Sequence, residues 1–383
     1  MAGGGGGCKA PSLLIPGPGR LVTFRAVCSN FAQNAAVEAP MSRTMLALAL
    51  QAALLRQPAA VFPDRTWKAL APSESGWSES QLAEARRFSE SIGSTAVFVV
   101  HRGQAVAQWG DVTRPINFRS GRKSLLNALI GIEIERGTIS LRQSLAELNI
   151  DDTAPALEEN ERRATVADLI TSRSGVYHPA AYEVPGTQRP ARHSHAPGTF
   201  FFYNNWDFNA LGTIYERAAG RSIFESFEKA IARPLQMQDF RAAEHTTSLK
   251  EEASIHPAYI FRMSARDLAR FGWLYANSGR WHDRQIVSRN WVEASTRAHV
   301  PNARAQNAYG YLWWVNLGPD GKEPMFWAAG AGGQFVLVVP ARQLVIVHLL
   351  DIPMLQEAIE SGKTVSWGQF FNLARQIAQA APK

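Results

Sequence analysis

Cysteine is nearly absent from this chain, and lysine is scarce. The 383 residues include two cysteines, Cys8 and Cys28, which both precede residue 40. A thiol nucleophile, a thiolate zinc site and a disulfide framework are therefore excluded from everything that follows. Eight lysines stand against 32 arginines. A lysine found in a motif therefore carries more information than an arginine would.

Long hydrophobic runs and blocks of like charge are missing as well. No stretch reaches about 18 uninterrupted apolar residues, so we expect no integral membrane segment. The net charge is +7, but the basic residues are scattered among acidic ones without a long run. This distribution argues against nucleic acid as a partner. The composition, 46% hydrophobic and 19% charged, is that of a globular protein.

Residues 1–60 differ from the rest of the chain and are interpreted as a leader. Gly3–Gly7 is a glycine run, and from Met41 a short basic head precedes the apolar stretch Thr44–Leu55. This pattern resembles a secretory signal, with Met41 as an alternative start, although Pro58 is atypical of a cleavage region. Two interpretations therefore remain. The segment is either a signal for export or a short amphipathic helix ahead of the domain in a cytoplasmic protein.

Residues 65–383 are predicted to form one domain. Helical spacing after Ser78, a candidate N-cap, predicts a helix over residues 80–91, and another is expected over 368–380. Apolar runs near both ends predict strands over residues 95–100, 105–109, 335–339 and 344–350. We therefore expect an α/β (α+β) fold in which distant segments share one antiparallel sheet. A mostly helical region, roughly residues 120–300, is inserted between the sheet segments.

Ser120 and Lys123 form an S-x-x-K motif ahead of the apolar stretch Leu125–Ile134, which predicts a buried helix. Residues three apart share a helix face, so Lys123 would lie beside the serine hydroxyl. A serine is a weak nucleophile that needs a base, and a lysine can serve if burial or a nearby cation lowers its pKa. The ordinary alternative is an N-cap serine and a surface lysine. A second such pair, Ser226 and Lys229, has no apolar helix behind it.

Tyr203 and Asn205 follow an aromatic run at the start of another predicted helix. A tyrosine beside a Ser/Lys pair can relay a proton to the leaving group, and an amide side chain can hold a substrate carbonyl. The alternative is a core aromatic residue followed by an asparagine N-cap. Tyr275 and Asn277 repeat the pattern within an ordinary helix.

A glycine-rich segment, residues 327–334, directly precedes the strand expected from Phe335. Glycine-rich backbone allows a ligand to approach closely, so Gly330 and Ala331 are candidates for substrate binding and for an oxyanion donor. The alternative is a bulge or a tight turn. His193 and His195 lack further ligands at suitable spacing, so we expect no metal site there.

In this order, the three motifs resemble those of the class C β-lactamase-like serine hydrolases, the penicillin-recognising family. The similarity extends from about Thr95 to Leu350 and is closest to the esterase and nylon-oligomer (aminohexanoate-dimer) hydrolase branch. Three further segments support it. Leu169–Val176 is similar to the family's LLTHTSG segment, Met263–Gly272 to one of its helices, and Tyr309–Trp314 to one of its strands.

The resemblance implies a role for each matching residue. Ser120 would be the acylated nucleophile, Lys123 its base or proton relay, and Tyr203 would complete the proton path. Asn205 would contact the substrate. The backbone N–H groups of Ser120 and Ala331 would form the oxyanion hole, and no cofactor would be required.

One departure from the family pattern narrows the substrate. Where the family often has K-T-G or H-x-G, this chain has Ala328-Ala329-Gly330, with neither cation nor hydroxyl. Penicillin-type substrates carry a carboxylate that such groups bind, so their absence disfavours a β-lactamase or a D-amino-acid-type peptidase. These two activities are kept as the alternative. We expect a hydrolase of small esters or amides, with Tyr177 lining the pocket. A non-catalytic penicillin-binding-like sensor is a further alternative, and the oligomeric state stays open.

Overall fold

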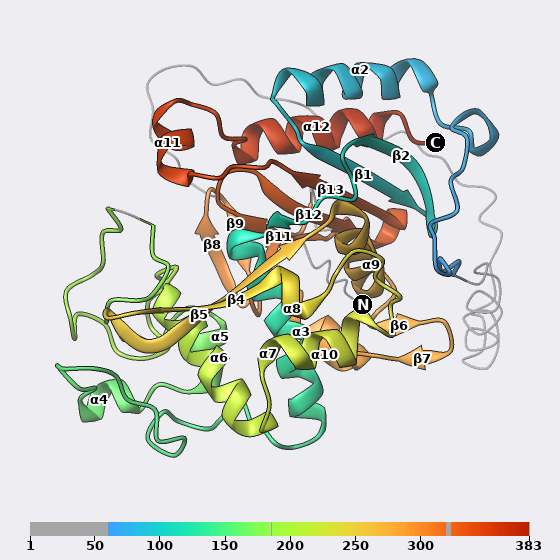
Figure 1. Ribbon diagram of the computed structural model, residues 1–383. Coiled ribbons are helices and arrows are strands. Elements are labelled where there is room, and N and C mark those ends of the chain that lie inside the picture. Colours follow the sequence, from blue (N-terminus) through green and yellow to red (C-terminus); the bar gives the residue numbers. More distant parts are fainter. Residues whose placement is uncertain (1–59, 185, 319–322, 383) are drawn as a thin grey trace, which may run out of the picture. The chain divides into compact units, whose positions relative to one another are not determined.

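The computed structural model describes residues 60–184, 186–318 and 323–382, which belong to one compact unit, Ala59–Lys383. The predicted leader lies outside these ranges up to residue 59 and stays a prediction. The unit is mixed α/β and its main sheet is antiparallel, which confirms the predicted fold class (Figure 1). No helix within the described ranges combines the length and the apolar character needed to cross a bilayer.

Helices lie at both ends of the unit and throughout its middle. The α-helices are α2 (Glu79–Ser91), α3 (Arg122–Glu135), α4 (Glu159–Arg162), α5 (Val166–Ile170), α6 (Asn205–Ala219), α7 (Ile223–Phe227), α8 (Ala242–His245), α9 (Ala265–Ala276), α10 (Arg289–Ser295), α11 (Leu355–Glu360) and α12 (Trp367–Gln379). Shorter turns are the 3₁₀-helices η1 (Ser73–Ser75), η2 (Arg119–Gly121) and η5 (Pro340–Arg342), and the π-helix η3 (Glu228–Ala232).

The strands gather into one large sheet and two small ones. They are β1 (Ala96–His101), β2 (Gln104–Gly110), β3 (Ile116–Asn117), β4 (Thr246–Glu251), β5 (Ser254–Met263), β6 (Arg280–Trp281), β7 (Arg284–Gln285), β8 (Val300–Arg304), β9 (Asn307–Tyr309), β10 (Trp314–Asn316), β11 (Met325–Gly330), β12 (Gln334–Val339) and β13 (Leu344–Leu349). The large sheet has eight strands in the order β2-β1-β13-β12-β11-β10-β9-β8. Strand β1 pairs antiparallel with β13, so the predicted sharing of one sheet by distant segments is confirmed.

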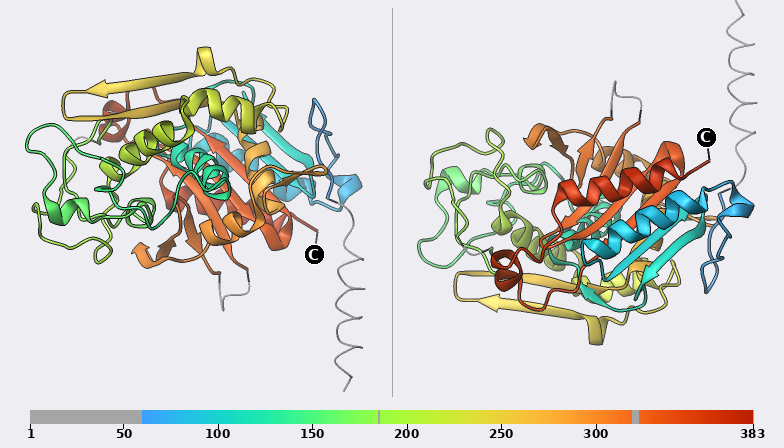
Figure 2. Two further views of the ribbon diagram at one scale, coloured as in Figure 1. Left: turned by 90° about the horizontal axis from the view of Figure 1, so that it is seen from below. Right: turned by 90° about the horizontal axis from the view of Figure 1, so that it is seen from above.

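Both faces of the large sheet are covered, which explains why β12 and β13 are apolar without alternation. Successive side chains of a strand point to opposite faces. Phe335 of β12 stacks on Phe370 of α12, with ring centroids 4.2 Å apart. On the other face, Gly272 of α9 lies so close that an added Cβ would be 3.0 Å from Val336 Cγ1. Figure 2 shows α2 beside α12 over one face of the sheet. Every residue of β12 is therefore buried.

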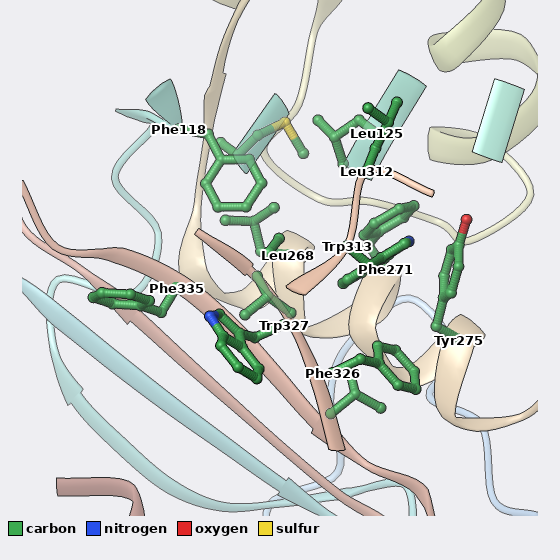
Figure 3. Packing of buried hydrophobic residues seen from close by; sticks show 14 of the residues in the cluster. Phe118, Leu125, Leu268, Phe271, Tyr275, Leu312, Trp313, Phe326, Trp327 and Phe335 are labelled. Carbon is green, nitrogen blue, oxygen red and sulfur yellow. The ribbon is translucent and has the colours of Figure 1, made fainter. Parts of the chain in front are cut away.

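A cluster of aromatic side chains joins the sheet to the helix behind the S-x-x-K motif (Figure 3). Trp313 stacks nearly parallel on Phe271 of α9, with centroids 6.0 Å apart. The Tyr275 hydroxyl donates to Asn127 Oδ1 of α3 at 2.6 Å, and the Asn127 amide donates to the Tyr311 carbonyl at 2.9 Å. These buried hydrogen bonds fix α3, and with it the motif at its start, against the sheet.

The inserted region contains a sheet that the sequence analysis did not predict. Strands β3, β5 and β4 form a three-stranded sheet, in which β4 and β5 are a long hairpin. The prediction of a mostly helical segment was therefore wrong over residues 246–263. Pro257 and the exposed Ile255 weaken the strand pattern there. The proline is tolerated because the described pairing of β3 with β5 covers only Arg262 and Met263.

Candidate active site

Ser120 lies in the 3₁₀ turn η2, directly ahead of α3. The turn is tight: a Cβ on Gly121 would lie 2.4 Å from the ring of Phe118, so only glycine fits there. The Ser120 side chain is partly exposed, and no side-chain cap bond is present at the start of α3. The alternative of an ordinary N-cap serine is therefore not what the structure shows.

The ammonium nitrogen of Lys123 meets three oxygens from two parts of the chain. It lies 2.9 Å from Ser120 Oγ, 3.0 Å from Tyr203 Oη and 2.8 Å from Asn205 Oδ1. The first contact follows from the spacing of three residues at a helix start. The other two require α6 to place its first turn opposite α3. The structure thus brings four of the predicted site residues together.

The surroundings of Lys123 favour its neutral form. The side chain is buried, and burial lowers the pKa of the ammonium group well below its usual range. The neighbouring guanidinium of Arg122 lowers this pKa further by repulsion. The nitrogen also lies 4.4 Å from the ring centres of Tyr203 and Phe208. A lysine in this setting can lose its proton at a pH where an exposed lysine cannot.

Tyr203 is held by aromatic packing just before α6. Its ring stacks on Trp314 of β10, with centroids 5.5 Å apart, and lies edge-on to Tyr309. Burial raises the pKa of the phenol to about 12, so its hydroxyl keeps its proton at neutral pH. The N-cap of α6 is Asn204, whose side chain accepts from the Trp206 N–H at 3.2 Å.

Asn205 uses both polar atoms of its amide within the protein. Its oxygen accepts from Lys123, and its nitrogen donates to the Tyr182 carbonyl at 3.2 Å. The expected contact between Asn205 and substrate stays a prediction. What the contacts show is a neutral acceptor that orients the lysine.

A buried carboxyl group ties the start of α6 to the segment predicted from the LLTHTSG resemblance. Asp207 accepts from the Ser174 hydroxyl at 2.5 Å and from the Asn204 amide at 2.8 Å. Burial raises the pKa of this carboxyl well above its usual range. The loop after Ser174 and the Tyr203–Asn205 segment are therefore held as one piece.

The glycine-rich segment lies against η2, the turn that carries Ser120. A Cβ on Gly330 would be 2.4 Å from the Phe118 carbonyl oxygen. Ala328–Gly330 pairs with β12, and its opposite edge pairs with no strand among the described residues, since β10 pairs only as far as Trp327. Ala331 follows at once. The structure shows a close approach of the protein's own backbone to Gly330. The substrate-binding role of Gly330 and the oxyanion role of Ala331 stay predictions.

The loop carrying Tyr177 is packed by aromatic contacts. The Tyr177 hydroxyl lies 3.1 Å from His195 Nδ1, and His195 stacks on Phe200 with centroids 3.9 Å apart. His193 pairs with Glu158 at 3.2 Å. No group of three potential metal ligands occurs among the residues that the structure describes. The assignment of Tyr177 to a pocket wall stays a prediction.

The second S-x-x-K pair lacks the geometry of the first. Ser226 is buried and accepts from Arg221 Nε at 3.1 Å. Lys229 is exposed and pairs with Glu225 one turn earlier. In the second Tyr-x-Asn pair, Tyr275 and Asn277, the Tyr275 hydroxyl donates to Asn127 in the core and not to a Ser/Lys pair.

Sequence reasoning missed three side chains that surround Ser120. Arg119 donates to the Tyr182 hydroxyl at 3.0 Å, as does the Asn117 amide. Arg122 is buried between the rings of Tyr182 and Tyr259, at 5.3 Å and 4.9 Å from their centres. The arginines stand inside or next to the motif, but their spacing alone carries no signal. Tyr182 lies in a loop without periodicity.

A cavity of about 600 Å³ is lined by other residues, and Ser120 is not among them. It is bounded by Ser91–Gly93, by the chain after β13 and by α11. Its polar side chains include no paired nucleophile and base. The reactive arrangement is therefore the one around Lys123.

Comparisons with known proteins identify the family and the fold. The family model described as Beta-lactamase matches residues 80–353, more than half of the chain. No curated protein sequence matches. Solved structures share the fold at low identity. A Bacillus anthracis protein assigned as a 6-aminohexanoate-dimer hydrolase is 20% identical, with a TM-score of 0.60, over 85% of this chain and 92% of that one.

Two further structures show the same fold. A protein of Bacteroides dorei assigned as a β-lactamase is 17% identical, with a TM-score of 0.61, over 79% of this chain and 99% of its own. EstCE1, a hydrolase with promiscuous acyltransferase activity, is 15% identical, with a TM-score of 0.55, over 79% and 98%. The extent of the family match decides the assignment: the chain belongs to the β-lactamase family and has the fold of its serine hydrolases.

Proposed function

We propose that the protein hydrolyses small esters or amides through an acyl-enzyme on Ser120. The observation that carries this proposal is the simultaneous contact of Lys123 Nζ with Ser120 Oγ, Tyr203 Oη and Asn205 Oδ1. Such contacts give a serine a base and give the base a path to a second hydroxyl. A sensor that binds its ligand without acylation has no need of a lysine whose pKa is held low by burial.

Acylation begins with the neutral amine of Lys123. The amine takes the proton of Ser120, and Oγ bonds to the substrate carbonyl carbon, whose oxygen becomes an oxyanion. Backbone N–H groups of Ser120 and Ala331 are the donors proposed for this oxyanion. As the tetrahedral intermediate collapses, the bond to the leaving group breaks. Lys123 returns its proton to that group through the Tyr203 hydroxyl.

Deacylation reverses these roles with water as the nucleophile. Lys123 and Tyr203 take a proton from the water, which adds to the acyl carbon. The bond to Ser120 Oγ then breaks and the serine regains its proton. The acid leaves, and the lysine is neutral again. No cofactor takes part in the proposal.

The proposed preference for esters and amides over penicillins rests on the uncharged side chains at the end of β11. Ala328-Ala329-Gly330 offers an open backbone edge next to the nucleophile turn but no cation or hydroxyl for a penicillin-type carboxylate. The names of two structural neighbours, a 6-aminohexanoate-dimer hydrolase and the hydrolase EstCE1, support the same preference. A β-lactamase or D-amino-acid-type peptidase is the alternative.

Covalent labelling tests the proposal directly. A fluorophosphonate probe should label the wild type and Ser226→Ala, but not Ser120→Ala. Burst kinetics with a chromogenic short-chain ester should then show turnover after acylation. Labelling that persists in Ser120→Ala would overturn the nucleophile. Acylation without turnover would identify a sensor, and turnover of nitrocefin faster than of esters would identify a β-lactamase.

A further inference from the structure

Positive charge gathers at the start of α3 without acidic partners. Within the described residues, Arg119, Arg122 and Lys123 each bond to neutral groups, and none contacts a carboxylate. Arg122 and Lys123 are fully buried, whereas Arg119 is partly exposed. Of these three basic side chains, Arg119 is therefore the one that a ligand can reach.

The backbone of Arg119 adopts an uncommon conformation that directs its side chain across the site. Its φ is +53°, in the left-handed region that residues other than glycine rarely adopt. The guanidinium donates to Tyr182 Oη at 3.0 Å and to the Ile352 carbonyl at 2.7 Å. A guanidinium has five N–H donors, so three remain beyond these two bonds. Strain of this kind concentrates at functional sites.

The acidic residues next to Ile352 and Tyr182, the two residues that Arg119 bonds to, form ion pairs with other arginines. Asp351, next to Ile352, pairs with Arg114 at 2.6 Å. Glu183, next to Tyr182, pairs with Arg189. A third acid, Glu251, accepts from the Tyr182 backbone N–H at 3.2 Å. None of these three carboxylates forms an ion pair with Arg119.

We propose that Arg119 binds a carboxylate of the substrate, so that the enzyme acts on an ester or amide that carries an acidic group. This inference rests on the proposed function. An arginine fork holds a carboxylate through two parallel hydrogen bonds. Arg119 directly precedes Ser120, so its side chain leaves the backbone one residue before the proposed nucleophile. A carboxylate a few methylene groups from the scissile carbonyl suits that reach.

This cation differs in origin from the one that the family pattern provides. The strand position of that cation is occupied here by Ala328 and Ala329, which carry no charge. Arg119 approaches instead from the turn that carries the nucleophile. The substrate's acidic group would therefore lie toward Tyr182 and Ile352, whose oxygens hold the Arg119 guanidinium.

Two matched substrate pairs test the proposal. The first compares the mono-para-nitrophenyl ester of adipic acid with para-nitrophenyl hexanoate, which differ only in the terminal group of the acyl chain. The second compares para-carboxyphenyl with para-carbamoylphenyl hexanoate and so places the charge on the leaving group. For each pair, kcat/KM is measured for the wild type, Arg119→Gln, Arg119→Lys and Arg304→Gln.

We expect the wild type to prefer the acid in at least one pair by about tenfold, as one good charge-assisted contact provides. Arg119→Gln should reduce that ratio to about one, and Arg119→Lys should leave it in between. Arg304 is the matched control. It is an exposed cation 5.2 Å from the centre of the Trp367 ring. Its positive charge also acts on Tyr203, where it opposes the rise in the pKa of the phenol. Its loss should change the ratio by less than about threefold.

Three results would overturn the proposal. The first is a wild type that shows no preference for the acid in either pair, and this result counts even if a variant fails to fold. The second is an Arg119→Gln variant that turns over both members of a pair equally more slowly, as loss of a purely structural contact would cause. The third is an equal fall of the ratio in Arg119→Gln and Arg304→Gln, as a general positive field would cause. Turnover of the neutral esters that depends on Ser120 would leave the proposed function standing in each case.

Discussion

The amide oxygen of Asn205 lies 2.8 Å from the side-chain nitrogen of Lys123, slightly closer than the hydroxyl oxygen of Ser120 at 2.9 Å. The nearest partner of the lysine is thus polar but uncharged. A neutral acceptor orients the nitrogen without stabilising its protonated form as a carboxylate would. The cation beside it, Arg122, acts in the same direction by repulsion.

Changing Asn205 to Asp should move the pH dependence of acylation. A carboxylate at this distance favours the charged lysine and so raises its pKa. Since the neutral amine is the base, kcat/KM rises as the pH passes through this pKa. The rising limb of the profile should therefore shift to higher pH in Asn205→Asp. A limb that stays in place would show that Lys123 is not the titrating base.

Lys123→Arg should be almost as inactive as Lys123→Ala. Arginine keeps the positive charge, but it does not lose its proton at any accessible pH. Acylation should fall by about 10²–10⁴-fold in both variants, the range expected for loss of a general base. The rate of fluorophosphonate labelling measures this step. Near-normal labelling of Lys123→Arg would assign the lysine a purely electrostatic role.

Tyr203→Phe should harm amides more than activated esters. The ring can still stack on Trp314, but the hydroxyl that lies 3.0 Å from Lys123 is lost. An amine leaving group must be protonated, whereas para-nitrophenolate leaves as the anion. We expect a loss of about 10²-fold or more for amides and a smaller one for para-nitrophenyl esters. Equal losses on both would argue against a proton path through Tyr203.

Gly330→Ala should impair catalysis by displacing the nucleophile turn. The new Cβ would meet the Phe118 carbonyl oxygen at 2.4 Å, which is backbone and cannot rotate away. We expect a lower labelling rate and a lower midpoint of thermal unfolding. Gly368→Ala is the matched control, because a Cβ there meets nothing closer than 3.9 Å. If both variants behaved like the wild type, β11 would not press on this turn.

His348→Gln should flatten the acid limb of the stability profile. His348 lies between the Gly333 carbonyl at 2.7 Å and the Ser94 hydroxyl at 2.8 Å, and burial lowers its pKa to about 4. Below the ordinary histidine pKa of about 6.5, His348 is protonated in the unfolded chain but stays neutral in the folded one. The stabilisation is thus fully present above pH 6.5 and is lost as the pH falls from 6.5 to about 4.

The loss is on the order of 3 kcal/mol across this window, from the difference between the two pKa values. Urea unfolding at several pH values between 7 and 4 measures it. The difference between wild type and His348→Gln should shrink as the pH falls. A constant difference would mean that His348 titrates in the folded state as it does in the unfolded one.

The sequence indicated the chemistry of the site better than its electrostatics. Ser120 lies in the turn that leads into α3 and Lys123 in its first turn, so their contact follows from local spacing. Tyr203 could be proposed only through motif order, because its contact with Lys123 joins segments 80 residues apart. The left-handed backbone of Arg119 and the position of Tyr182 depend on packing between distant loops. Periodicity carries no information about either.

The fold was predictable where burial is complete. β1, β12 and β13 are covered on both faces, so their apolar runs stand out in the sequence. The β4–β5 hairpin is partly exposed and contains Pro257, and its pattern is correspondingly weak. The sequence predicted that strands from the two ends of the domain share one sheet, but it did not predict the order of the strands within that sheet.

The pairing of β1 with β13 also has a consequence for synthesis. Residues 96–101 leave the ribosome long before residues 344–349, with which they share a hydrogen-bonded ladder. At about 5–20 residues per second, the delay is on the order of 10–50 s. The turn that carries Ser120 is made early in this interval, whereas the strand that presses on it, β11, is made near its end. A nascent chain therefore carries Ser120, the proposed nucleophile, for most of translation without the strand that packs against its turn.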